Sequence, residues 1–246
     1  MTQPCSARTC VVMPVYNEEA TVSAVLDSVR RYFDGWVVLV DDGSTDGTAD
    51  IVAKRDDVLL CRHEGNLGYG ASLRTGFAAA LGLGATTIIT MDCDGQHEPR
   101  HITEFCTKLE ECGTDMVSGS RYLPESLKGD AAPPDRLTVN QEVTGIINAT
   151  TGWCLTDAFC GFKAYTADAL RRVAIDEGGY AMPLEFWARA WRAGVSMCEM
   201  PVERIYFDHD RSFGEHLDDP AARLAYYLSV WQRALDENCV SGKAGD

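Results

Sequence analysis

The segment Thr87-Ile88-Ile89-Thr90-Met91-Asp92-Cys93-Asp94 joins a short apolar stretch, long enough for one buried strand, to two acidic residues. Apolar stretches of similar length recur along the first half of the chain, at residues 9–13, 36–40, 58–61 and 116–119. Amphipathic patterns lie between them: Val22, Val25 and Val29, for example, repeat at the i, i+3 and i+7 spacing of a helix. Strands that alternate with helices predict an α/β fold with a single, mostly parallel central sheet flanked by helices.

The sequence also suggests where some elements begin and end. Asn17 is placed to cap the helix that follows the first strand. Residues 66–81 and 183–193 are expected to be helical, and Pro99 stands where a further helix can start. Residues 123–137 contain three prolines and are expected to form a loop, and a loop of that length in a compact domain is usually functional.

Composition limits the class of protein. The chain has 246 residues, of which 46% are apolar, enough for one α/β domain with a good core. The net charge of −15 disfavours a nucleic-acid partner. No run approaches the roughly 20 apolar residues that span a bilayer, and residues 1–8 show no secretory signal, so we expect a cytoplasmic protein. Its ten cysteines form no C-x-x-C pair and are expected to be reduced.

Three polar clusters follow predicted strands: Tyr16-Asn17-Glu18, Asp41-Asp42 and Asp92-Cys93-Asp94. In an open parallel sheet, ligands gather beyond the carboxyl ends of the strands. Any one of these clusters could simply cap a helix. Three of them at the same edge of one sheet indicate a ligand site.

The pair Asp92 and Asp94 indicates a metal ion. In an extended backbone, side chains two residues apart point the same way, and two carboxylates so close repel unless a cation lies between them. Hard oxygen ligands suit Mg²⁺ or Mn²⁺, which complete their shells with water and phosphate oxygens. Gln96 follows as a third expected ligand, and His97 is either a further ligand or a loop histidine bonded to the backbone.

Asn66-Leu67-Gly68-Tyr69-Gly70 is a glycine-rich helix start that would let a ligand approach backbone N–H groups. Its spacing is neither the G-x-G-x-x-G of a dinucleotide enzyme nor the G-x-x-x-x-G-K-S/T of a P-loop. These two classes of nucleotide-binding protein are therefore disfavoured.

Four of these stretches together resemble the ordered motifs of the family 2 glycosyltransferases: residues 12–19, 40–48, 66–70 and 91–97. The resemblance covers roughly residues 9–120. It implies a GT-A fold, inversion at the anomeric carbon and a divalent metal. It also implies a nucleoside diphosphate sugar as donor, with GDP-mannose and UDP-glucose both left open.

The second half narrows the resemblance. Gly119-Ser120-Arg121-Tyr122, residues 157–165 and Arg211-Ser212-Phe213-Gly214-Glu215 are similar to the subgroup that transfers mannose or glucose to dolichyl or polyprenyl phosphate. This subgroup implies a polyprenyl phosphate acceptor. The chain would meet such a lipid at the cytoplasmic face of a membrane, through an apolar loop near Leu123 and Leu127 or through a membrane partner protein.

The resemblance divides the chain into a flexible N-terminus (1–8), a GT-A domain (9–235) and a C-terminal tail (236–246). Within the domain, residues 9–120 form the nucleotide-sugar half and residues 121–235 the acceptor half. The expected nucleotide-sugar residues are Pro14, Tyr16, Asn17, Glu18, Asp42, Asn66, Gly68 and Asp92, with Asp42 near the base or ribose. The expected metal ligands are Asp92, Asp94 and Gln96. The expected acceptor-phosphate residues are Arg121, Arg136 and Arg211, all in loop-like contexts, and the expected catalytic residues are Asp94, Arg121, Asp157 and Arg211.

Two alternatives remain open. Transfer to a sugar or small-molecule hydroxyl would need a general base, for which Asp157 and Glu185 are candidates. A non-catalytic nucleotide-sugar binding protein would need no such group, and it would not hydrolyse the donor.

Overall fold

The computed structural model describes residues 8–124, 129–205 and 217–236. Seven strands form one sheet in the order β3-β2-β1-β4-β6-β5-β7. The strands are β1 (Thr9–Val15), β2 (Trp36–Asp41), β3 (Leu59–Arg62), β4 (Thr87–Thr90), β5 (Met116–Ser120), β6 (Lys163–Thr166) and β7 (Met197–Pro201). All neighbours pair in parallel except β6, which runs antiparallel to both β4 and β5. The expected α/β fold with a mostly parallel sheet is confirmed.

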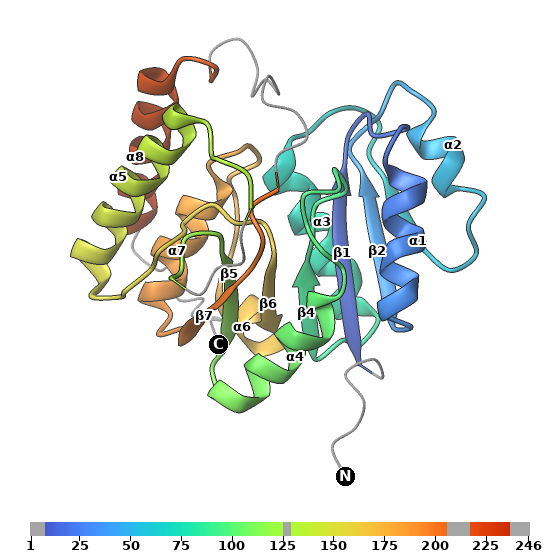
Figure 1. Ribbon diagram of the computed structural model, residues 1–246, viewed down its shortest axis with the longest axis horizontal. Coiled ribbons are helices and arrows are strands. Elements are labelled where there is room, and N and C mark those ends of the chain that lie inside the picture. The colour runs from blue at the N-terminus through green and yellow to red at the C-terminus, as the bar shows by residue number, and fades with distance from the viewer. Residues whose placement is uncertain (1–7, 125–128, 206–216, 237–246) are drawn as a thin grey trace, which may run out of the picture.

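Helices cover both faces of the sheet (Figure 1). They are α1 (Val22–Tyr32), α2 (Thr48–Val52), α3 (Tyr69–Gly82), α4 (His101–Cys112), α5 (Pro134–Thr151), α6 (Ala167–Arg172), α7 (Met182–Arg192) and α8 (Pro220–Asp236). Alternate residues of β1 enter two separate cores: Val11 and Met13 pack with α1 and α4, whereas Cys10 and Val12 pack with α3 and α7. Burial on both faces explains why β1 has no polar alternation.

The expected strands and helices of the first half are present, with ends that differ by a few residues. The predicted helix cap at Asn17 is wrong, because α1 begins only at Val22. Asn17 has a φ of 55°, and its side chain instead accepts the Thr45 N–H at 2.8 Å. The loop expected over residues 123–137 is also too long, because α5 begins at Pro134, a residue suited to the first helical turn. Arg136 is therefore helical rather than in a loop.

Three smaller expectations, on membrane spans, cysteines and the end of the last helix, can be compared with the structure. No helix in the described ranges has the length and apolar character needed to cross a membrane. Seven of the described cysteines are free, as expected, but Cys106 is disulfide-bonded, so the expectation is wrong there. Helix α8 extends to Asp236, one residue past the predicted end of the domain.

Candidate active site

A cavity of about 690 Å³ opens at the carboxyl ends of β1, β2 and β4. It is lined by every residue expected to bind the nucleotide sugar: Pro14, Tyr16, Asn17, Glu18, Asp42, Asn66, Gly68 and Asp92. The topology explains this convergence, because the three strands are neighbours in the order β2-β1-β4 and point the same way.

The loops that follow β1 and β2 are fastened to each other through backbone groups. The Asn17 N–H donates to Ser44 Oγ at 2.9 Å, and the Glu18 N–H donates to Thr48 Oγ1 at 2.8 Å. The hydroxyl of Thr21 bridges onward, donating to the Cys93 carbonyl at 3.0 Å. The three strand-end clusters are thus one connected structure.

Asp42 is 4% exposed and organises the glycine-rich helix start. Its carboxylate accepts the N–H groups of Leu67 at 2.9 Å and Gly68 at 2.8 Å, and it contacts His63 Nδ1 at 2.7 Å. Gly68 has φ 100°, and a Cβ there would lie 2.4 Å from the Gly178 carbonyl oxygen, so only glycine fits. Asp42 therefore shapes the loop as well as lining the cavity.

Asp92, Asp94 and Gln96 all line the cavity. Asp92 Oδ1 accepts the Tyr69 hydroxyl at 3.2 Å, and Asp94 Oδ1 accepts the Gln96 N–H at 2.9 Å. Burial and the nearby Asp92 raise the pKa of Tyr69 well above its ordinary value, so its hydroxyl keeps the proton that it donates. Of the two roles considered for His97, its geometry matches a loop histidine bonded to the backbone, because His97 Nδ1 accepts the backbone N–H of Asp92 at 3.0 Å.

The donor set fits a divalent cation with an incomplete protein shell. Two carboxylates and one amide oxygen face the same cavity, and these are the hard ligands that Mg²⁺ and Mn²⁺ prefer. No group of three or more His, Cys, Asp or Glu side chains suited to a metal occurs in the described part of the chain. Diphosphate oxygens and water would therefore supply the remaining ligands.

Basic side chains also line the cavity. Of the three arginines expected to bind the acceptor phosphate, Arg121 and Arg136 line the cavity, whereas Arg211 lies outside the described residues. Lys163 and Arg223 also line it and were not predicted. Lys163 lies within residues 157–165, one of the segments that resemble the polyprenyl-phosphate subgroup, so the sequence could have indicated it as a site residue. Arg223 lies on α8, a helix that no motif marked.

These two additional cations are held in place by their surroundings. Burial lowers the pKa of Lys163 below its ordinary value; its ammonium donates to the Cys160 carbonyl and lies 5.5 Å from the centre of the Trp187 ring. Arg223 donates to Asp135 at 2.7 Å. The basic side chains that line the cavity therefore come from β6, α5, α8 and the segment after β5.

The two candidate bases do not line the cavity as the described residues define it. Asp157 is fully buried and pairs with Arg121 at 2.7 Å. Glu185 is 2% exposed, accepts the N–H groups of Asp176 and Glu177, and pairs with Arg189 at 3.1 Å. Both carboxylates are engaged within the protein.

Aromatic side chains form an apolar wall of the cavity. Tyr69 and Tyr180 stack with their ring centres 6.2 Å apart, and Phe159 and Tyr227 lie 4.9 Å apart. All four residues line the cavity, and Tyr180 is 40% exposed. This wall was not predicted, since its members come from four distant parts of the chain.

Comparison with known proteins identifies the family. The sequence profile described as Glycosyl transferase family 2 matches residues 10–174. This chain belongs to glycosyl transferase family 2. It is 30% identical over 206 residues to part of a glycosyltransferase of Haloferax volcanii, covering 78% of this chain and 32% of that protein.

Relatives that match over most of their own length are also present. An undecaprenyl-phosphate mannosyltransferase of Micrococcus luteus is 30% identical, with 85% of this chain and 86% of that protein covered. A polyprenol monophosphomannose synthase of Mycolicibacterium smegmatis is 28% identical, with 79% and 76% covered. The predicted resemblance to this family and subgroup is confirmed.

The GT-A fold is also confirmed for this glycosyltransferase. A crystal structure of glucosyl-3-phosphoglycerate synthase from Mycobacterium tuberculosis, in complex with Mn²⁺, UDP and glucosyl-3-phosphoglycerate, superimposes with a TM-score of 0.67. The match covers 92% of this chain and 79% of that one at 20% sequence identity. At this identity the likeness concerns the fold alone, and the roles of individual residues stay predictions.

Proposed function

We propose that this glycosyltransferase moves mannose or glucose from a metal-bound nucleoside diphosphate sugar to a polyprenyl phosphate, with inversion at the anomeric carbon. The observation that carries the proposal is the presence of both kinds of charge in one cavity: Asp92 and Asp94 line it, and so do Arg121 and Arg136. A diphosphate bound through a cation matches the carboxylates, here called the donor side, and an anionic acceptor matches the arginines, here called the acceptor side.

On the donor side, Asp92, Asp94 and Gln96 would hold Mg²⁺ or Mn²⁺, which offsets the charge that builds on the leaving diphosphate. The likeness to a fold crystallised with Mn²⁺ and UDP supports this choice of cofactor. The loop shaped by Asp42 would hold the nucleoside, with carboxylate and backbone groups near base and ribose.

On the acceptor side, a phosphate monoester is already an anion at neutral pH. One of its oxygens forms the bond to the anomeric carbon while the bond to the diphosphate oxygen breaks, so no proton has to be removed. Arginine forks bind phosphate oxygens in a bidentate manner, and Arg121 and Arg136 would orient the nucleophile in this way. The ion pairs of Asp157 with Arg121 and of Glu185 with Arg189 support a phosphate acceptor over a hydroxyl acceptor, which would need one of these carboxylates as a base.

The lipid part of the acceptor has a matching surface. Tyr180, Phe159 and Tyr227 line the same cavity as the arginines and would contact the first isoprene units. The named activities of the relatives from Micrococcus luteus and Mycolicibacterium smegmatis support the acceptor class. The reaction would take place at the cytoplasmic face of a membrane, with the segment near Leu123 closest to the lipid; Leu127 lies outside the described residues.

The test is transfer of labelled sugar from GDP-mannose or UDP-glucose to a short polyprenyl phosphate, with the matching polyprenyl alcohol as control. We expect transfer to the phosphate alone, and its loss in Arg211→Ala with donor binding intact. Equal transfer to the alcohol, or transfer to a soluble sugar with none to the lipid, would contradict the proposal. A chain that binds the donor but neither transfers nor hydrolyses it would be a binding protein.

A further inference from the structure

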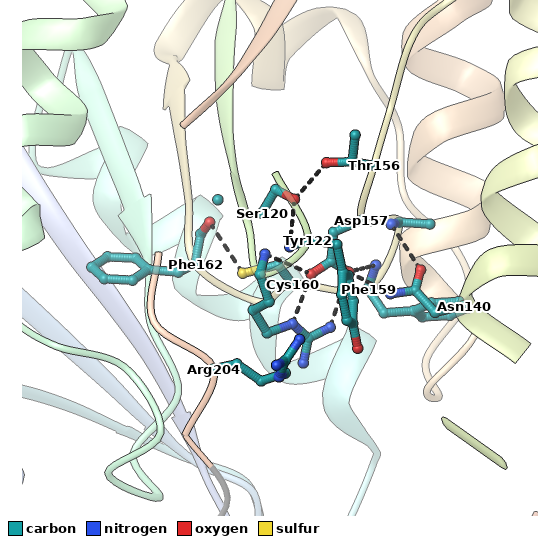
Figure 2. A network of polar contacts seen from close by, with 12 residues as sticks. Ser120, Tyr122, Asn140, Thr156, Asp157, Phe159, Cys160, Phe162 and Arg204 are labelled. Carbon is teal, nitrogen blue, oxygen red and sulfur yellow. Dashed lines mark hydrogen bonds and ion pairs between the residues drawn. The ribbon is translucent and has the colours of Figure 1, made fainter. Parts of the chain in front are cut away.

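Asp157 is enclosed by hydrogen-bond donors (Figure 2). Its Oδ2 accepts Arg121 Nε at 2.7 Å and the Arg121 backbone N–H at 3.2 Å. Its Oδ1 accepts Arg121 Nη2 at 2.9 Å, Asn140 Nδ2 at 2.9 Å and the Phe159 N–H at 3.1 Å. A carboxylate offers about four lone-pair sites. Because the Asp157 carboxylate already accepts five hydrogen bonds, it has no lone pair left to take a proton from a substrate.

The electrostatics of Asp157 agree with this geometry. Burial by itself would raise the pKa of Asp157, but the charge and hydrogen bonds of Arg121, together with the charge of Lys163, keep that pKa below its ordinary value. A carboxylate with a lowered pKa is a weaker general base. The stable form of Asp157 is the anion that faces Arg121.

A second layer fixes the backbone on either side of this pair. Glu199, on β7, accepts the backbone N–H groups of Thr156 at 2.9 Å and Asp157 at 3.2 Å. The Thr156 hydroxyl lies 2.5 Å from Ser120 Oγ, which also accepts the Tyr122 N–H at 3.1 Å. The segments that carry Asp157 and Arg121 are thereby tied to each other and to the sheet.

We propose that Asp157 is a positioning residue that holds the Arg121 guanidinium at the cavity wall and takes no proton in the reaction. The inference rests on the proposed function, in which Arg121 contacts the acceptor anion. The planar fork of Arg121 turns its Nε and Nη2 edge to Asp157, which fixes the plane of the guanidinium. Glu199 and Asn140 act one step further back, by fixing Asp157.

The test is a double-mutant cycle of Arg121→Ala and Asp157→Asn, measured as transfer of labelled sugar to a short polyprenyl phosphate. Each single substitution is expected to lower kcat by about 10²-fold. Because Asp157 acts through Arg121, Asp157→Asn added to Arg121→Ala should change kcat by less than about threefold. Multiplicative losses in the double variant, or loss of an acid limb of the pH–rate profile in Asp157→Asn, would overturn the positioning role.

Glu185→Gln is the matched control, since Glu185 is a buried carboxylate that also accepts two backbone N–H groups. It should lower the melting temperature and leave kcat unchanged. In the Arg121→Ala variant, Asp157 loses the partner of its buried charge, so the melting temperature should fall and partly recover when Asp157→Asn is added. No recovery would argue against the pair.

A readout that does not depend on the acceptor separates this inference from the proposed function. In ¹⁵N-labelled protein, the Arg121 Nε–H resonance should be protected from exchange in the wild type and in Glu185→Gln, and lost in Asp157→Asn. A resonance that survives Asp157→Asn overturns the positioning role whatever the acceptor is. A wild-type chain that transfers no sugar to the lipid phosphate overturns the proposed function alone.

Discussion

The donor side and the acceptor side of the cavity are built in different ways. On the donor side, Asn17 and Asp42 follow strand ends within a few residues, and their side chains accept backbone N–H groups. On the acceptor side, side chains pair with each other across long sequence separations, as Arg223 does with Asp135, 88 residues away. The donor-side residues therefore stand directly after strands that the sequence predicts, whereas the acceptor-side pairs join segments that no single motif contains.

The largest effect should come from the donor side. Asp94→Ala removes one of two carboxylates that would hold the metal, and we expect a loss of about 10³-fold in turnover together with most of the donor affinity in Mn²⁺. Isothermal titration of the donor with and without Mn²⁺, and initial rates, would measure both effects. Full activity in this variant, or in the wild type with a strong chelator present, would remove the metal from the donor side.

The sequence predicted the donor side better than the acceptor side, and the reason is physical. The spacing of apolar residues and the polar turns after strands are local signals in the sequence. They were enough to locate β1 to β5, and also Asp92, Asp94 and Gln96, without the structure. Arg223 and Tyr227 reach the cavity through the packing of α8, which no local signal encodes. Likewise, the burial of Asp157 behind Arg121 depends on strands β5 and β7 meeting the segment before β6.

The next effect tests the acceptor side. Arg136→Ala, on the first turn of α5, should reduce transfer to polyprenyl phosphate by about 10²-fold, since an oriented cation at a reacting anion contributes on this scale. The affinity for the nucleotide should stay unchanged. Arg171→Ala, an exposed arginine on α6, is the control and should retain activity. Equal weakening of donor and acceptor binding would mean that the two sides are not separate.

A smaller effect is expected at Asp42. Its substitution tests whether Asp42, like Asp157, is a carboxylate that shapes the site rather than binding the ligand. Asp42→Asn places an amide N–H₂ where Leu67 and Gly68 N–H groups or His63 now donate, so UDP and GDP should both bind about tenfold more weakly. Competition titration measures the two affinities, with Asp50→Asn, at an exposed position of α2, as control. Loss for one nucleotide alone would show that Asp42 reads the base, and unchanged affinities would remove it from the site.

The smallest effect concerns a partly exposed ion pair of the donor half, in contrast to the buried Asp157. Asp57 accepts hydrogen bonds from Arg55 and Arg30, which lower its pKa from 3.8 to about 2 although burial opposes the change. Because the folded-state pKa is lowered, the pair stabilises the fold fully above pH 3.8, and this contribution is lost as the pH falls toward about 2.

The Asp57 carboxylate is 33% exposed, so solvent screening should limit its contribution to about 1 kcal/mol. Urea unfolding at pH 7, 4 and 3 would compare the wild type with Asp57→Asn, using the exposed neighbour Asp56→Asn as control. The stability difference should be largest at pH 7 and shrink at pH 3, with no such trend for Asp56→Asn. A loss as large as that of Arg121→Ala would mean that burial does not distinguish the ion pairs of the two halves.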